Sequence, residues 1–348
     1  MGMVGPEAGE DLVALHKESI ERMLHGIRKY QAHEYSRDSA PLEVVWSEGT
    51  STLFFCPRVG DAKDAGTILL IPSMINGSEI LDLLPQRSFV RWMAGQGFDV
   101  YLLDWGKPAA DDGLQTLDGG VVKRLLSAAR VVQDRQGGGP VDALGYCMGG
   151  TLLLGAAATE AALFNKLILL SAPWDFHAGD PRMMAQVMTG TPSALSLLEE
   201  KSFLPIDWIQ NVFAHVNPRL AIDKFSAFLE MTPDSEEEKI FIAVEDWLNG
   251  GQDLSAGVAR ACILDWYAAN KPAKGEWVDL GVLSGHPVLV VGAGKDILVP
   301  PESAYAVLQH IPGADKLGPS CGHISLMAGR KARETVWQPI CDWLNPLA

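Results

Sequence analysis

A cysteine stands between glycines where the chain passes from a strand-like to a helix-like pattern. The segment GYCMGG, residues 145–150, follows the apolar run VDAL and precedes TLLLGAAA. In a turn this tight, side chains at Gly145 and Gly149 would collide with the neighbouring strand and helix, and Cys147 is pushed into the cleft. Unpaired N–H groups and the positive dipole end of a helix start favour negative charge there. The pattern predicts a nucleophilic cysteine; the alternative is a buried structural cysteine at a glycine-rich packing point.

Two residues far downstream could form a catalytic set with Cys147. Asp296 follows the apolar run PVLVVGAGK, and His323 lies in SCGHIS about one short strand-helix unit later. The chain order nucleophile, acid, histidine is that of a nucleophile elbow and its partners, all at the carboxyl ends of strands. We expect His323 to take the thiol proton, and Asp296 to hold the imidazole tautomer and stabilise its charged form. Asp175 is the competing acid, and a lone Asp or His in such places is commonly a turn former or a loop residue.

An oxyanion hole should lie beside this set. The expected donors are the backbone N–H of Met148, directly after the nucleophile, and that of Ile75 in the loop of residues 73–76. Cys321, two residues before His323, lacks such a turn, and we expect it to be structural.

The segments that must position these residues alternate between strand-like and helix-like patterns. Helical stretches cover residues 88–95 and 117–136, and the apolar runs are LEVVW, STLFFC, TILLIP, GFDVYLLDW, VDALGYC, NKLILLSAP and, much later, HPVLVVGAGKD. Continuously apolar strands suit a sheet covered on both faces. With the cysteine turn, this predicts an α/β-hydrolase fold, a doubly wound and mostly parallel sheet, with a core of residues 41–173 and 286–348. Residues 174–285 lose the strand rhythm and are expected to form an inserted helical cap.

Two further helices are expected outside the core. Residues 7–31 carry apolar side chains at helical spacing among charges, which predicts an amphipathic helix within an N-terminal region of residues 1–40; it would dock on its own chain or on a partner. In the cap, Thr232 is the expected N-cap, with Pro233 at the first helical position. The acidic residues 236–238 are expected to form a solvated helix start and not a metal site.

The composition limits the function classes. The chain has 348 residues, 47% hydrophobic and 20% charged, as in soluble globular proteins, and its net charge of −15 disfavours binding of nucleic acid or anionic lipid by the molecule as a whole. The five widely spaced cysteines, without a CxxC pair, indicate a reducing cytoplasm and neither a disulfide framework nor a zinc site. We expect neither export nor a transmembrane segment, because no apolar stretch approaches about 20 residues.

Over residues 41–344 the sequence resembles the polyhydroxyalkanoate (poly-3-hydroxybutyrate) synthase family. The segment IPSMINGSEILDLLPQRSFVRWMAGQGFDVYLLDWGKP is similar to the family's oxyanion loop, "ILDL" stretch, "SLVR" helix and "V-x-L-x-DW" strand end, and GYCMGG matches its lipase-like box. SAPWDF and VEDWLNGGQDLSAGVARACILDWYAAN resemble the strand end after the nucleophile helix and the cap helices. GKDILVPP and CGHI match the sites of the acid and the histidine.

The resemblance implies a cytoplasmic, granule-associated acyltransferase that polymerises (R)-3-hydroxyacyl-coenzyme A. Cys147 would be the acylated nucleophile, His323 its base and Asp296 the acid, which in the family is also thought to help activate the attacking 3-hydroxyl. No metal or cofactor is implied, since coenzyme A enters as the leaving group. The short chain resembles the class III synthases, which implies a second non-catalytic subunit; a homodimer is also considered. Ile297 and Met148 depart from the residues most often seen at these positions in the family.

The cap is expected to exclude water and to guide an apolar chain. Asn76 and Trp247 are the expected substrate contacts, and most of the large apolar cap side chains should be cap core: Trp174, Trp208, Trp247, Trp266, Trp277, Met183, Met184 and Met188. One alternative is a cysteine-triad hydrolase, such as a thioesterase, polyester depolymerase or dienelactone-hydrolase-like enzyme, in which water resolves the acyl-enzyme. A second is a non-catalytic, granule-associated homologue.

Overall fold

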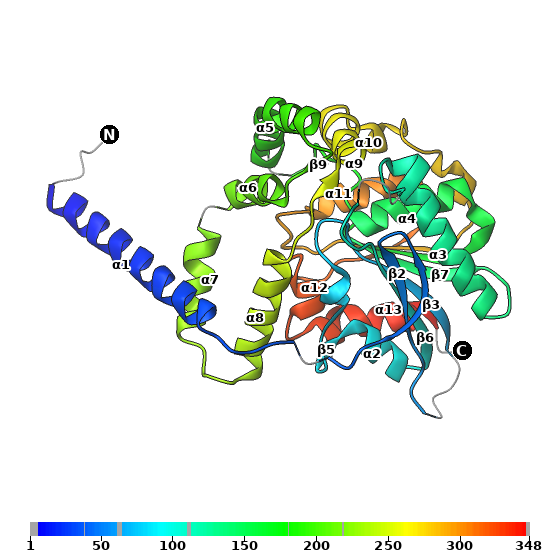
Figure 1. Cartoon of the computed structure of the whole chain (residues 1–348), viewed down its shortest axis with the longest axis horizontal. Helices are drawn as coiled ribbons and strands as arrows, with labels where there is room; N and C mark the ends of the chain where they lie inside the picture. Colours follow the sequence, from blue (N-terminus) through cyan, green and yellow to red (C-terminus); the bar gives the residue numbers. More distant parts are fainter. Residues whose placement is uncertain are drawn as a thin grey trace.

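The computed structural model describes residues 6–37, 39–60, 65–109, 113–179, 181–217 and 219–345, built around one eight-stranded sheet (Figure 1). The strand order is β1-β2-β6-β3-β7-β8-β11-β12. The bounds are β1 (Glu43–Glu48), β2 (Ser51–Cys56), β3 (Gly66–Ile71), β6 (Phe98–Asp104), β7 (Val141–Tyr146), β8 (Phe164–Leu170), β11 (Val288–Val291) and β12 (Asp315–Leu317). The pairs β1–β2 and β2–β6 are antiparallel and the others parallel, so the predicted mostly parallel sheet is confirmed.

Helices cover both faces of this sheet. Successive residues of β3 point to opposite faces: Leu69 packs in the apolar core beneath α3 (Val122–Arg135) and α4 (Met148–Thr159), and Leu70 in the core beneath α2 (Phe89–Gly95) and α13 (Gln338–Leu344). Both side chains are fully buried, which explains why the central strands read as continuous apolar runs.

The expected cap helices lie between β8 and β11. Their bounds are α5 (Pro181–Glu200), α6 (Ile206–Val216), α7 (Leu220–Leu229), α8 (Glu236–Asn249), α9 (Ala256–Ala261) and α10 (Lys271–Lys274), with a short hairpin of β9 (Phe203–Leu204) and β10 (Leu254–Ser255). The remaining elements are the hairpin β4 (Asp82–Leu84) and β5 (Arg87–Ser88), α11 (Pro301–Tyr305) and α12 (Ser325–Ala328). Whether residues 174–285 behave as a separate unit stays a prediction. None of the described helices combines the length and apolarity needed to cross a membrane.

Helix α8 begins later than predicted. Its N-cap is Ser235, whose hydroxyl accepts a hydrogen bond from the Glu238 N–H at 3.2 Å, while the Glu238 carboxylate accepts one from the Asp234 N–H at 2.7 Å. The placement of the N-cap at Thr232 is therefore wrong. The reason is that Asp234 has a φ of 59°, a left-handed conformation that a helix starting at Pro233 could not include.

The prediction of a solvated start for α8 holds for Glu236 and Glu237, whose side chains are 54% and 58% exposed, but is wrong for Glu238. Glu236 lies 3.3 Å from the Arg87 guanidinium and Glu237 3.1 Å from that of Arg330. Glu238 is only 3% exposed and pairs with the Lys29 ammonium at 2.7 Å. These three carboxylates therefore join the cap helix to the core and to the N-terminal helix.

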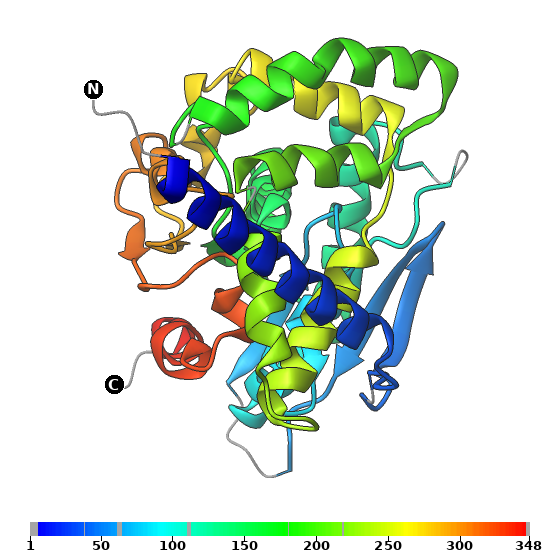
Figure 2. The ribbon, with the colours of Figure 1, turned by 90° about the vertical axis from the view of Figure 1, so that its left-hand side faces the viewer.

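The predicted N-terminal helix is present as α1 (Pro6–Gln31) and crosses α7 and α8 (Figure 2). The crossing is close, since a Cβ on Gly26 would lie 2.0 Å from the Phe225 carbonyl oxygen. Arg22 pairs with Glu230 at 2.8 Å, and the Tyr30 hydroxyl donates to Asp246 at 2.6 Å. Of the two predicted docking partners, the helix thus uses its own chain, at the cap.

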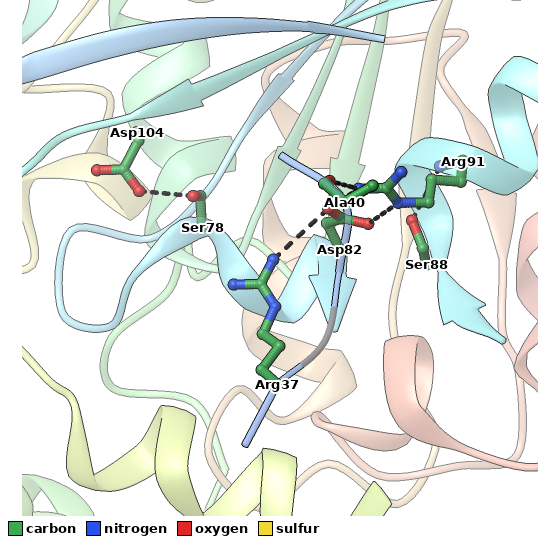
Figure 3. Close-up of polar contacts among 7 residues, drawn as sticks. All are labelled: Arg37, Ala40, Ser78, Asp82, Ser88, Arg91 and Asp104. Carbon is green, nitrogen blue, oxygen red and sulfur yellow. Dashed lines mark hydrogen bonds and ion pairs between the residues drawn. The ribbon is translucent and has the colours of Figure 1, made fainter. Parts of the chain in front are cut away.

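A buried carboxylate fastens the segment after α1 to the core. Asp82 accepts hydrogen bonds from the Arg91 guanidinium at 2.8 and 3.0 Å and pairs with Arg37 at 3.5 Å, while Arg91 also donates to the Ala40 carbonyl (Figure 3). The Asp82 side chain is only 3% exposed. Asp82, the aspartate of the "ILDL" stretch, therefore has a structural role: it holds the segment after α1 against the core.

Candidate functional site

Cys147 occupies the sharp turn between β7 and α4 that the sequence predicts. Its φ of 55° and ψ of −130° are unusual for a residue with a side chain. A Cβ on Gly145 would lie 2.4 Å from the Gly150 Cα, and one on Gly149 would lie 2.3 Å from the Ile71 carbonyl oxygen. Both obstacles are backbone atoms that cannot swing away, so the predicted need for glycine at these positions is confirmed.

The fold brings His323, Asp296 and Cys147 together at one edge of the sheet. The His323 Nδ1–H donates to Asp296 Oδ2 at 2.6 Å, and the imidazole lines the same cavity as the Cys147 side chain, which acts on it electrostatically. The other Asp296 oxygen accepts the N–H groups of Leu298 and Val299, both at 2.9 Å. With Nδ1 held by the carboxylate, the Nε2 of His323 is left to face the thiol.

The environment of His323 favours its protonated form. The side chain is 8% exposed, and burial acts to lower its pKa. The negative charges of Cys147 and Asp296 and their hydrogen bonds outweigh this effect and raise the pKa to about 10. The arrangement therefore suits a protonated imidazole beside Cys147.

The competing acid Asp175 lies in a different network. Its Oδ1 accepts the His177 N–H at 2.9 Å and the Asn270 amide at 2.8 Å. Both contacts of Asp175 are with loop residues, and neither involves His323. The structure therefore pairs Asp296, and not Asp175, with this histidine.

The two predicted oxyanion donors line one cavity with Cys147. Met148 is the first residue of α4, where a helix N–H has no carbonyl partner within the helix. The Ile75 N–H, in contrast, donates to the Ser73 hydroxyl at 3.2 Å. Ile75 must exchange this contact before it can serve an oxyanion, and its role stays a prediction.

Asn76 and Trp247 also line the cavity, but their polar groups bind the protein itself. The Asn76 amide donates to the Trp247 carbonyl at 2.9 Å and to the Leu248 carbonyl at 3.3 Å, and the Trp247 indole N–H donates to the Gly77 carbonyl at 2.8 Å. These bonds tie the loop after β3 to the end of α8. A substrate contact from either residue stays a prediction, and it would have to use the remaining surface.

The cavity over Cys147 is apolar and measures about 170 Å³. Three of the cap tryptophans line it, namely Trp208, Trp247 and Trp266, whereas Trp247 was the tryptophan that the sequence analysis expected to contact the substrate. Trp174 and Trp277 lie outside this lining and contact each other with their rings tilted by 50°. Met184 borders a smaller pocket and Met188 is exposed, while the Met183 side chain lies outside the described part of the structure.

Two neighbours of the catalytic set were missed by the sequence analysis. Tyr146 stacks on the His323 imidazole, and Ser73 receives the Ile75 N–H. An aromatic residue directly before the nucleophile was the available signal for Tyr146, whereas Ser73 was marked only as part of the predicted oxyanion loop of residues 73–76. Within the described ranges, no group of three or more His, Cys, Asp or Glu residues is placed to hold a metal ion. Cys321 is half-buried, and burial raises the pKa of its thiol.

Several proteins named as poly(3-hydroxyalkanoate) polymerases are similar to this chain. "Poly(3-hydroxyalkanoate) polymerase subunit PhaC" of Haloferax mediterranei is 30% identical over 321 residues, covering 89% of this chain and 65% of the relative. The protein of the same name from Allochromatium vinosum is 27% identical over 317 residues, covering 88% of each chain. The chain thus spans slightly less than two thirds of the length of the Haloferax relative.

The fold is shared with solved enzymes. A highly thermostable carboxyl esterase from Bacillus coagulans superimposes with a TM-score of 0.59 at 14% identity, covering 88% of this chain and 99% of that chain. The family model described as "alpha/beta hydrolase fold" matches residues 66–329, which include β3, the cysteine turn, Asp296 and His323. The chain therefore belongs to the α/β-hydrolase fold family, as its sheet order and its nucleophile turn indicate.

Proposed function

We propose that the protein is an acyltransferase that polymerises (R)-3-hydroxyacyl-coenzyme A into polyhydroxyalkanoate and releases coenzyme A. The observation that carries the proposal is Cys147 on the turn after β7, in one cavity with His323, which is hydrogen-bonded to Asp296. The relatives named as polymerases over most of the chain support the reaction class. A cysteine suits it because thiol–thioester exchange is nearly balanced in energy.

Acylation begins when the His323 Nε2 takes the proton of the Cys147 thiol. The thiolate attacks the thioester carbonyl and forms an Sγ–C bond, and the Met148 N–H stabilises the resulting oxyanion. The Ile75 N–H adds a second donor when it leaves the Ser73 hydroxyl. Collapse breaks the bond between the carbonyl carbon and the sulfur of coenzyme A, and the imidazolium returns its proton to that sulfur.

Elongation requires a 3-hydroxyl to attack the acyl-cysteine. His323 takes the hydroxyl proton, the new C–O bond forms the ester, and Cys147 leaves and recovers the proton as a thiol. Asp296 acts mainly through the imidazole, because one of its oxygens already accepts two backbone N–H groups and the other accepts His323. No bound metal or cofactor is required, because coenzyme A is itself the leaving group.

The cavity supports transfer to an acyl acceptor over transfer to water. Its lining is mostly apolar, with tryptophans from α6, α8 and the π-helical segment Cys262–Ala268 that follows α9. A cavity of about 150 Å³ in another protein accommodates benzene, so 170 Å³ fits an acyl group of similarly few atoms.

The proposal includes growth at the surface of a polymer granule in the cytoplasm, with a second copy or a non-catalytic subunit as partner. Exposed apolar side chains on cap elements support contact with a polyester, since they are 37–49% exposed: Met188, Phe203, Leu220 and Leu264.

The decisive experiment incubates the purified chain with 3-hydroxybutyryl-coenzyme A and follows thiol release and turbidity together. Polymer with thiol supports the proposal, whereas thiol without polymer indicates a hydrolase. Mass spectrometry after exposure to a saturated acyl analogue that cannot elongate should place the adduct on Cys147, and the Cys147→Ala variant should lack it. If neither turnover nor an adduct is detected, the result favours a non-catalytic homologue.

A further inference from the structure

The strand that delivers the nucleophile also delivers an aromatic ring to the base. Tyr146 is the last residue of β7 and is 1% exposed. Its ring and the His323 imidazole are stacked, with centroids 5.1 Å apart and planes inclined by 29°. The Tyr146 hydroxyl donates to the His323 carbonyl at 3.3 Å, so the tyrosine contacts both the side chain and the backbone of the histidine.

The stack occupies a side of the imidazole that its other partners leave free. Asp296 binds Nδ1 and Cys147 faces the opposite nitrogen, both at the ring edge. The other ionisable groups around this site are Cys321, on the histidine's own loop, and Lys295, next to the acid. Burial and the charges of Cys262 and Cys147 raise the pKa of Tyr267, which lines the same cavity. Tyr146 contributes an uncharged aromatic face to this group.

An aromatic face carries negative charge density and attracts a cation placed over it, and the attraction grows when water is excluded. The imidazole is neutral before the thiol gives up its proton and cationic afterwards. A ring stacked on it therefore favours the state after proton transfer over the state before it. Burial raises the pKa of the Tyr146 hydroxyl well above its usual value, so this group stays protonated and remains a donor.

We propose that Tyr146 is a positioning residue for the base: its ring stabilises the protonated His323 in the thiolate–imidazolium pair, and its hydroxyl fixes the turn that carries the histidine. The inference deepens the proposed function and rests on the same Cys147–His323 pair. It assigns the electrostatic effect to the ring and the smaller, geometric effect to the hydroxyl, because a 3.3 Å hydrogen bond is long.

The test is an NMR titration of His323 in protein labelled with ¹⁵N-histidine, which needs no turnover. In Tyr146→Phe the imidazolium should lose its proton within about 0.3 pH units of the wild type. In Tyr146→Leu this loss should occur roughly 0.5 to 1 unit lower, as expected for a buried cation–π contact. The descending limb of kcat/KM against pH should move by the same amount.

Two further variants protect the test from folding effects. Pentafluorophenylalanine at position 146 keeps the shape of the ring but reverses the charge of its face, and it should lower the titration as the leucine does. Tyr305→Leu removes another tyrosine whose hydroxyl holds backbone carbonyls, and it should leave the titration unchanged. The proposal is overturned if the leucine and fluorinated variants titrate like the wild type, or if phenylalanine shifts the titration as much as leucine. A polymerase that proves to be a hydrolase would leave these outcomes unaffected.

Discussion

Replacing Asp296 by asparagine should reverse the tautomer of His323. One carboxylate oxygen of Asp296 accepts the N–H groups of Leu298 and Val299, both at 2.9 Å, and the other accepts the His323 Nδ1–H at 2.6 Å. An amide has one acceptor and one donor end. The two backbone N–H groups select the carbonyl oxygen, so the NH₂ group must face the histidine.

The geometry sets the size of the effect. Turning the amide the other way would leave two buried N–H groups opposite a donor, at a cost of about 1–3 kcal/mol for each. The imidazole therefore becomes an acceptor at Nδ1 and carries its proton on Nε2, where it cannot take the proton of Cys147. A tautomer reversal of this kind lowers kcat by about 10⁴ in a Ser-His-Asp enzyme, which corresponds to about 5.4 kcal/mol in the barrier.

The assay compares Asp296→Asn with Asp175→Asn. Asp175 also accepts two N–H donors on one oxygen, from His177 and Asn270, but it does not contact the catalytic set. Thiol release from an acyl-coenzyme A and the rate of Cys147 alkylation at pH 7 should both fall steeply in the first variant, and stay within about threefold of the wild type in the second. If Asp296→Asn keeps more than a tenth of the wild-type kcat, the tautomer argument is refuted.

Three further predictions concern stability, each measured by urea unfolding. Gly149→Ala should lose about 3 kcal/mol or more, because its Cβ would lie 2.3 Å from a backbone oxygen, whereas Gly95→Ala, with open space at that position, should be nearly neutral. Asp82→Ala should lose about 2–4 kcal/mol, because it leaves two guanidinium groups without their buried partner, while kcat should stay within about threefold. The folded-state pKa of His323, about 10, lies above its ordinary 6.5, so its stabilising contribution is complete below pH 6.5 and is lost as the pH rises through 10. Cys147→Ser removes the partner that raises this pKa most, so the loss should begin at lower pH.

The residue pattern alone was sufficient to predict the sheet and the meeting of Cys147, Asp296 and His323 at one of its edges. Continuous apolar runs predicted buried parallel strands, and the cysteine turn has severe local steric demands that only glycine at positions 145 and 149 meets. Parallel strands end at a common edge, so chain order was enough to select Asp296 and His323 as partners of Cys147. These features depend on local chemistry and on a topology with few alternatives.

Tertiary packing decided what the pattern left open. The burial of Glu238 depends on Lys29, 209 positions earlier in the chain, and the polar groups of Asn76 and Trp247 are used by segments about 170 residues apart. Tyr146 reaches His323 across 177 positions. A local pattern indicates which kinds of group a side chain can bind. The actual partner of a buried polar group depends on which distant segment packs against it.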